Sequence, residues 1–325
     1  SPDAVVASVD GNGATADLIT YWIGYNATYL NSYMQYYGGG ALDWDYVMSD
    51  GTAMPDYIKQ DVLATVKQEL VIENLAEKYG VELTDEQLSA MESDEQGFIE
   101  QYGGEEGFDA ELAKLGLRRE TYERITRTNY LYQDLYKLYL TEGSALYASN
   151  EDLAAYAAAQ GYITADHILL TTVDTATGEA LSDEQKAEKK ALAEELAEKL
   201  KNYTGDDLAS YFAELADEYS EDPGRASNPT GYTFTTGSMV QEFEDAAYAL
   251  DEGAVSDIVE SSFGYHILLR LPLDKTAAAE TVREDYFSNF IDEQMDKAKT
   301  ATSAEYDKLD AKALYEAIVA AQAEG

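Results

Sequence analysis

The sequence predicts an α+β protein in which a central module of strands and helices is inserted between helical segments. Residues 1–160 carry apolar residues at helical spacing, strand-like runs appear within residues 161–273, and helical spacing returns over residues 274–325. The C-terminal segment is too short to build a core of its own. We therefore expect it to pack with the N-terminal segment as one all-helical domain around the central module.

The N-terminal segment contains start and stop signals for several helices. Pro55 suits the first turn of a helix over residues 55–79, and Gly80 suits its end. Residues 84–87, Thr-Asp-Glu-Gln, form a capping-box pattern that opens another helix. Further helices are expected over residues 17–37, 119–140 and 151–159.

Four tyrosines in the first of these helices lie four residues apart, so they share one helical face. They are Tyr21, Tyr25, Tyr29 and Tyr33. We interpret the stripe as ordinary helix packing. The alternative is a surface that binds unfolded chains, since tyrosine offers adaptable apolar surface.

The central segment alternates short apolar runs with helical patterns. Strands are expected over residues 162–172, 255–260 and 265–271. Helices are expected to begin at the capping box of residues 182–185 and at Asp207, with a short one over residues 241–250. Pro272 ends the last strand, and the final helix of the chain is expected over residues 312–323.

The charge balance excludes several functions. The chain has 63 acidic and 22 basic residues, a net charge of −41, so it repels nucleic acids and is poorly suited to acidic membrane surfaces. Cysteine is absent, which excludes disulfides, thiolate nucleophiles and iron–sulfur clusters. No zincin or phosphate-loop motif occurs, and we expect neither metal nor cofactor. The start, Ser1-Pro2-Asp3, suggests a processed chain whose targeting segment lies upstream.

The tetrapeptide His-Ile-Leu-Leu occurs twice and contains both histidines of the chain, His167 and His266. A lone histidine beside apolar strand residues is usually a core residue. The sequences that follow the two copies share no period, which argues against an internal duplication. If the two strands pair in one sheet, the two histidines come together.

Several motifs lie in order around these histidines. They are Ala165-Asp166-His167-Ile168-Leu169, Ser220-Glu221-Asp222-Pro223, Phe234-Thr235-Thr236-Gly237-Ser238-Met239, Phe243-Glu244-Asp245-Ala246-Ala247, Gly253-Ala254-Val255-Ser256 and Gly264-Tyr265-His266-Ile267. Together they resemble the parvulin family of peptidyl-prolyl cis–trans isomerases. The resemblance implies a four-stranded antiparallel sheet with surrounding helices. Helical flanks around such a domain resemble PrsA-type foldase lipoproteins and, more loosely, SurA-type chaperones. The N-terminal residues 5–11 resemble the short opening strand of those proteins.

The resemblance also implies roles for individual residues. The catalytic set is His167, Asp222, His266 and Ser261, and the proline pocket is formed by Met239, Phe243, Phe234 and Tyr232. The chain departs from the family pattern at Gly231, which stands where many members carry a pocket leucine. We expect Tyr232 to supply the missing apolar surface. There are simpler alternatives, in which Met239 and Phe243 are ordinary core residues and Asp222 is an ordinary turn residue.

These residue types suit rotation about an X–Pro bond, whose barrier of about 20 kcal/mol comes from amide resonance and needs no covalent chemistry. The resemblance implies an isomerase and foldase acting on unfolded secreted proteins. The alternative function is a holdase chaperone with an inactive or secondary isomerase domain. The resemblance also implies an extracytoplasmic location, with a lipid anchor upstream of Ser1 as the only membrane contact. The sequence leaves homodimer formation open.

Overall fold

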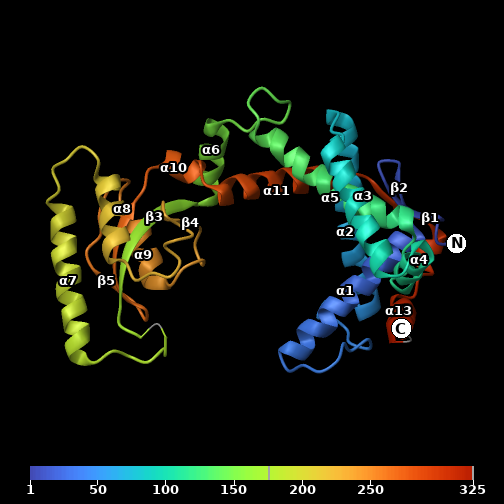
Figure 1. Ribbon diagram of the computed structural model, residues 1–325, viewed down its shortest axis with the longest axis horizontal. Helices are drawn as coiled ribbons and strands as arrows, with labels where there is room; N and C mark the ends of the chain where they lie inside the picture. Colours follow the sequence, from blue (N-terminus) through green and yellow to red (C-terminus); the bar gives the residue numbers. More distant parts are fainter. Residues whose placement is uncertain (175, 324–325) are drawn as a thin grey trace. The chain divides into compact units, whose positions relative to one another are not determined.

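The computed structural model describes residues 1–174 and 176–323, which form two compact units. The first unit combines residues 1–147 with residues 289–325, and the second covers residues 148–288 (Figure 1). The boundary near residue 288 lies within helix α11, Glu280–Lys297.

The first unit is mainly helical. In chain order its helices are α1 Ala16–Tyr36, α2 Met54–Tyr79, α3 Asp85–Gln101, α4 Glu105–Lys114, α5 Arg119–Leu140, the end of α11, α12 Ala304–Asp307 and α13 Ala311–Ala323. The predicted start and end of α2 are confirmed: Pro55 lies in its first turn, and Gly80 ends the helix in a left-handed conformation. Thr84 and Gln87 form the capping box of α3. Helix α4 was not anticipated from the sequence.

This unit also contains a small antiparallel sheet, so the prediction of an all-helical domain is wrong in this detail. Its strand order is β2-β1-β7, with β1 at Val5–Val9, β2 at Asn12–Thr15 and β7 at Thr300–Thr302. The strand β1 lies where the opening strand was expected. By contrast, β7 has three residues, all exposed, which is too short for a detectable alternation of apolar and polar residues.

Only Tyr21 of the α1 tyrosine stripe packs against a core cluster, so our interpretation of ordinary helix packing is wrong for the other three. The buried residues of this helix end at Ala27, and Tyr25, Tyr29 and Tyr33 are exposed. The spacing correctly placed these side chains on one face, but spacing alone does not determine which face meets the core. Here the core is met by Leu18, Ile19 and Ile23 instead.

The second unit is built on a four-stranded antiparallel sheet of order β4-β3-β6-β5, as the resemblance implied. The strands are β3 Ile163–Thr171, β4 Tyr232–Phe234, β5 Val259–Glu260 and β6 Gly264–Arg270. The strand expected over residues 255–260 is shorter: only β5 is regular, and Val255 makes a single bridge to Leu269. The central strands β3 and β6 are almost completely buried.

Helices cover both faces of this sheet. Ile168, Leu170 and Ile267 pack with α7 Asp183–Lys201 and α8 Leu208–Tyr219 on one face. Ala165 and Leu268 pack with α9 Gln241–Ala249 on the other. Because strand side chains alternate between faces, both histidines lie on the α9 face.

The second unit extends beyond residues 161–273 at both ends. Helices α6 Asn150–Gln160 and α10 Leu273–Ala277 pack against each other, and α10 also contacts β3. Tyr156 and Tyr162 both donate hydrogen bonds to Oδ2 of Asp285 on α11, each at 2.9 Å. The division into segments 1–160, 161–273 and 274–325 stays a prediction.

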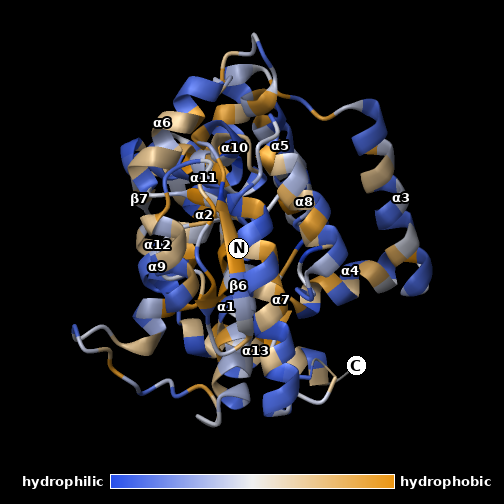
Figure 2. Ribbon diagram, turned by 90° about the vertical axis from the view of Figure 1, so that its left-hand side faces the viewer, coloured by the Kyte–Doolittle hydropathy of each residue, from blue (hydrophilic) through white to orange (hydrophobic). Residues whose placement is uncertain are grey.

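Helices throughout the described chain mix hydrophilic and hydrophobic residues; α3, for example, carries both colours along its length in Figure 2. Across residues 1–174 and 176–323, no helix combines the length and apolar character needed to cross a membrane.

Candidate active site around the paired histidines

The two histidines contact each other through neighbouring strands. In the antiparallel register His167 lies opposite Leu268 and His266 lies opposite Leu169, so the histidines are diagonal neighbours. Their Nδ1 atoms are 3.3 Å apart, and their rings are nearly parallel, at 24° and a centroid distance of 5.4 Å. Both side chains are buried.

Asp222 reaches His167 from the segment that follows α8. Its Oδ2 lies 3.0 Å from Nε2 of His167, and its Oδ1 accepts a hydrogen bond from the Gly224 backbone N–H at 3.0 Å. The preceding residues hold this segment against β3: Ser220 Oγ accepts from the N–H of Leu169, and the Glu221 N–H donates to the Leu169 carbonyl. These backbone contacts fix the carboxylate beside the imidazole.

Ser261 is the polar partner of the second histidine. Its Oγ lies 2.7 Å from Nε2 of His266 and accepts a hydrogen bond from the Phe263 backbone N–H at 3.1 Å. Ser261 lies in the turn just before β6, five residues from His266 in the chain. A local turn therefore positions this hydroxyl.

With both imidazoles neutral, these contacts form a continuous chain of hydrogen bonds with one direction. With Asp222 ionised, His167 donates to it from Nε2–H, so His167 Nδ1 is an acceptor. His266 then donates from Nδ1–H, and its free Nε2 accepts from the Ser261 hydroxyl. Both histidines are neutral in this arrangement, with opposite tautomers.

The surroundings favour a neutral His266 and an ionised Asp222. Burial lowers the pKa of His266 to about 4, and the neighbouring His167 adds to the effect. Burial acts to raise the pKa of Asp222, but hydrogen bonds from His167, Tyr232 and the Gly224 N–H outweigh it, so that pKa is lowered. An ionised carboxylate and an uncharged His266 are therefore the stable pair at neutral pH.

Phe243 forms the apolar centre of the site. Its ring meets the edges of both imidazoles, at centroid distances of 5.2 Å to His167 and 5.7 Å to His266. Phe234 is buried beneath it, at 5.7 Å, and so supports Phe243 rather than lining an open surface. Met239 is half-buried and packs against the same cluster.

A carboxylate that the sequence analysis did not single out holds Met239 in place. Glu244 is buried on α9 and accepts hydrogen bonds from the backbone N–H groups of Gly237, at 2.9 Å, and Met239, at 2.8 Å. These two bonds lower the pKa of Glu244. The sequence signal for this role was the position of Glu244, an acidic residue directly after the apolar Phe243 in a short helix.

Residues 167–271 match the family model described as a PPIC-type PPIase domain of the rotamase class. This match covers the two histidines, Asp222, Ser261 and the apolar cluster. The segment is a parvulin domain. The enzyme class of the family model is that of the peptidyl-prolyl isomerases, and the chain is similar to proteins named PrsA.

Proteins that match other lengths of the chain show lower identity as the matched length grows. The foldase protein PrsA of Geobacillus sp. is 38% identical over 122 residues, which is 37% of this chain and 42% of that protein's length. The PrsA of Staphylococcus aureus is 28% identical over 250 residues, covering 74% of this chain and 68% of the relative. A crystal structure of PrsA from Bacillus cereus is 23% identical, covers 84% of this chain and 98% of that one, and has a TM-score of 0.30.

The departure at Gly231 has a structural reason in this parvulin domain. Gly231 has a φ of +88°, and a Cβ there would lie 2.9 Å from the backbone of Ala165 and Asp166. No side chain fits, so Gly231 cannot supply a pocket wall. Tyr232 instead faces the site: its ring lies 5.5 Å from that of His167, and its hydroxyl donates to Asp222 at 2.6 Å.

Tyr232 therefore gives the parvulin domain both an apolar ring and a hydrogen-bonding hydroxyl, and the sequence analysis predicted only the ring. Burial raises the pKa of Tyr232 to about 12, and the hydrogen bond to the Asp222 carboxylate adds to the shift. The hydroxyl thus stays protonated and keeps donating. Nothing near Tyr232 in the sequence indicated that its partner is Asp222, ten residues earlier.

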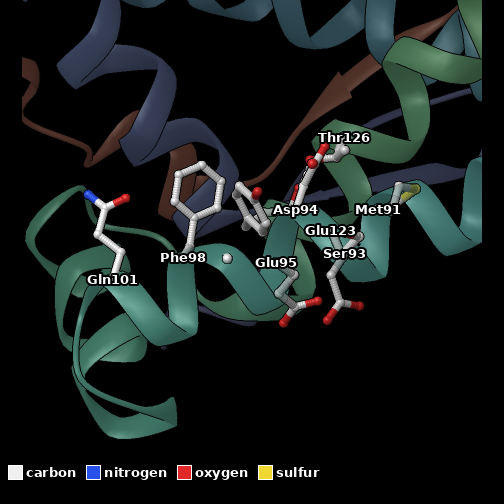
Figure 3. Close-up of a pocket in the computed structure, with 10 residues that line it drawn as sticks. Met91, Ser93, Asp94, Glu95, Phe98, Gln101, Glu123 and Thr126 are labelled. Atoms are coloured by element: carbon white, nitrogen blue, oxygen red, sulfur yellow. Dashed lines mark hydrogen bonds between the residues drawn. The ribbon is translucent and has the colours of Figure 1, made fainter.

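A separate groove lies in the first unit, between α3 and α5, and contains none of these residues. Met91, Phe98 and Tyr122 line it together with Asp94, Glu95 and Glu123 (Figure 3). Over residues 1–174 and 176–323, no group of three acidic or histidine side chains is arranged to hold a metal ion.

Proposed function

We propose that the chain is a foldase whose parvulin domain interconverts the cis and trans forms of X–Pro bonds in unfolded proteins. The observation that supports this best is the continuous hydrogen-bond chain Tyr232–Asp222–His167–His266–Ser261 beside Phe243. It combines a polar array with the apolar side chains of Phe243 and Met239. The similarity to PrsA foldases supports the choice of unfolded proteins as substrates.

The reaction needs differential binding rather than covalent chemistry. Twisting the X–Pro amide breaks its resonance, so an enzyme has only to bind the twisted form better than either planar form. Met239, Phe243 and the ring of Tyr232 provide the grip on the proline ring. A fixed proline ring lets the preceding residue rotate about the C–N bond.

The polar residues then act on the changing charge of the amide. In the twisted form the carbonyl oxygen loses negative charge and the nitrogen regains its lone pair. We assign Asp222 as the polar group closest to the bond, and the Tyr232 hydroxyl as the donor that holds its orientation. The two histidines and Ser261 are positioning residues: each imidazole hydrogen bond is to another member of the hydrogen-bond chain, and Ser261 bonds His266 and the Phe263 backbone N–H.

A protease-free isomerisation assay of the full chain on short X–Pro peptides tests this function. We expect isomerisation faster than the uncatalysed reaction, which takes tens to hundreds of seconds. Asp222→Asn, which keeps the shape but removes the charge, should lower the rate. A folded chain without any rate above background would exclude the isomerase and leave the holdase.

The holdase alternative has an observation in its favour. The exposed tyrosines on α1 give the first unit an aromatic surface outside the parvulin domain. A holdase would suppress aggregation of an unfolded client equally well with His266→Ala, whereas a foldase that depends on isomerisation would lose its effect on refolding rates. Refolding of a proline-limited client in the presence of either protein distinguishes the two.

We further propose an extracytoplasmic location with a lipid anchor upstream of Ser1, supported by the similarity to PrsA foldases. Unfolded secreted proteins that contain X–Pro bonds are the proposed clients. Fractionation of cells that express the complete precursor, with labelling of its lipid, tests both statements.

A further inference from the structure

The second half of α1 presents a row of tyrosine rings to solvent. Tyr25, Tyr29 and Tyr33 are exposed to 58%, 62% and 52%, and Tyr37, just after the helix, to 69%. We call these four residues the tyrosine ladder. Exposed aromatic surface of this extent is unfavourable in water and usually marks a binding surface.

Ring contacts hold the members of the ladder in place, and Tyr25 is held by the rings of Tyr21 and Trp22. The ring centroids of Tyr29 and Tyr33 are 6.5 Å apart with the rings stacked, and those of Tyr33 and Tyr37 are 4.6 Å apart. Tyrosine has few rotatable bonds, so little conformational entropy remains to be lost on binding. The ladder is therefore organised before any ligand arrives.

The ladder lies in the least charged part of an acidic chain. None of residues 18–42 is charged, although charged residues make up 26% of the chain. Depletion of charge and enrichment of tyrosine are typical of the centre of a protein interface. Asp43, Asp45 and Asp50 follow directly, and the described part of the chain contains no ion pair to any of them.

The spacing of the ladder matches an extended polypeptide. Four residues of helix rise about 6 Å, so the ladder from Tyr25 to Tyr37 spans about 18 Å. Every second side chain of an extended strand points the same way, with a repeat of about 6.7 Å. One ring can therefore meet each alternate side chain over a short extended segment.

We propose that the tyrosine ladder binds an extended, unfolded polypeptide segment with apolar side chains at alternate positions. A lysine or arginine in the segment is favoured by charge complementarity, because the chain carries a net charge of −41. The proposal deepens the foldase function, on which it rests for the source of the segment. Binding to the ladder can still be measured without isomerisation.

Fluorescence anisotropy of a labelled peptide with the full chain tests the proposal. The peptide has valine and phenylalanine at alternate positions, threonine between them and lysines at one end. The double variant Tyr29→Ser/Tyr33→Ser should bind it at least about tenfold more weakly, because two aromatic contacts are lost. Tyr102→Ser removes another exposed tyrosine, 40% exposed, from outside the ladder and should change binding less than about twofold.

Two further peptides test the geometry and the charge. The same residues reordered so that the apolar ones follow a helical spacing should bind more weakly. Replacing the lysines by glutamates should also weaken binding, with a difference that shrinks at high salt. Unchanged binding by the double variant, or an equal loss in Tyr102→Ser, would overturn the proposal.

Other occupants of the ladder would also be recognised. If the parent sediments as a dimer without peptide and the double variant as a monomer, a second copy covers the ladder and the proposal fails. Tyrosine-dependent binding to neutral phosphatidylcholine vesicles, without peptide binding, would equally contradict it. Turnover of a short X–Pro peptide should be the same in parent and double variant, so a failed isomerase and a failed ladder give different results.

Discussion

The two copies of His-Ile-Leu-Leu have the same local sequence and the same strand environment, yet their histidines have different polar partners. His167 meets the carboxylate of Asp222, 55 residues away in the chain, and His266 meets the hydroxyl of Ser261, five residues away. One copy faces a charge and the other an uncharged group. The partner, rather than the strand, therefore determines how each histidine can act.

The largest effect is expected from Phe243→Ala, because Phe243 contacts both histidines. Removing a buried phenyl ring should lower the free energy of unfolding by about 3–5 kcal/mol. Urea unfolding measures this. Phe263→Ala is the matched control, since that ring is 51% exposed and should cost less than about 0.5 kcal/mol. Equal losses in the two variants would mean that Phe243 is not the centre of the site.

The next effect is the pH dependence of stability that His266 causes. The pKa of His266 is about 4 in the folded protein against 6.5 in the unfolded chain. Between these values the unfolded chain binds a proton that the folded protein does not, so stability present above pH 6.5 is lost as pH falls. The loss should reach about 3 kcal/mol near pH 4.

The parent and His266→Gln should therefore differ most in unfolding free energy at pH 7 and less at pH 4.5. Comparing the two proteins cancels the contributions of other groups, of which Asp222 is the nearest charged one. Ring titration followed by NMR provides a second measurement. A His266 ring that titrates near pH 6.5 would contradict the proposed neutral tautomer.

A smaller effect on stability, but a larger one on activity, is expected from Asp222→Asn. Hydrogen bonds to a charged group contribute about 1.5–3 kcal/mol, so kcat/KM should fall roughly tenfold or more. The pKa of Tyr232, about 12 beside the carboxylate, should move down toward its ordinary value of 10. Ultraviolet titration of the tyrosines checks this shift. An unchanged kcat/KM would remove Asp222 from the catalytic residues.

The smallest effect is expected at the second copy, from Ser261→Ala. It removes one neutral hydrogen bond to His266 and should cost about 1 kcal/mol, or a few-fold in kcat/KM. Ser261→Thr keeps the hydroxyl and should restore activity. If Ser261→Ala proves more damaging than Asp222→Asn, the order of importance of the two copies is reversed.

Much of the fold could be predicted from local signals. The capping boxes of α3 and α7, the Pro55 start and Gly80 end of α2, and the two buried strands all lie where the sequence placed them. The short strands β4 and β7 could not be predicted, because they have three residues each, and β5, with two residues, was predicted too long. Their conformation depends on pairing with distant strands rather than on local preference.

The sequence by itself determined that two histidines, an aspartate, a serine and an apolar group belong to one module, because motif order and spacing are local properties. Only the tertiary structure decided which atoms meet. The bond from Tyr232 to Asp222 and the support of Met239 by Glu244 depend on how loops are anchored to β3 and α9. It also decided that Tyr25, Tyr29 and Tyr33 of α1 face solvent. A helical period groups side chains on one face, but burial depends on the remaining chain.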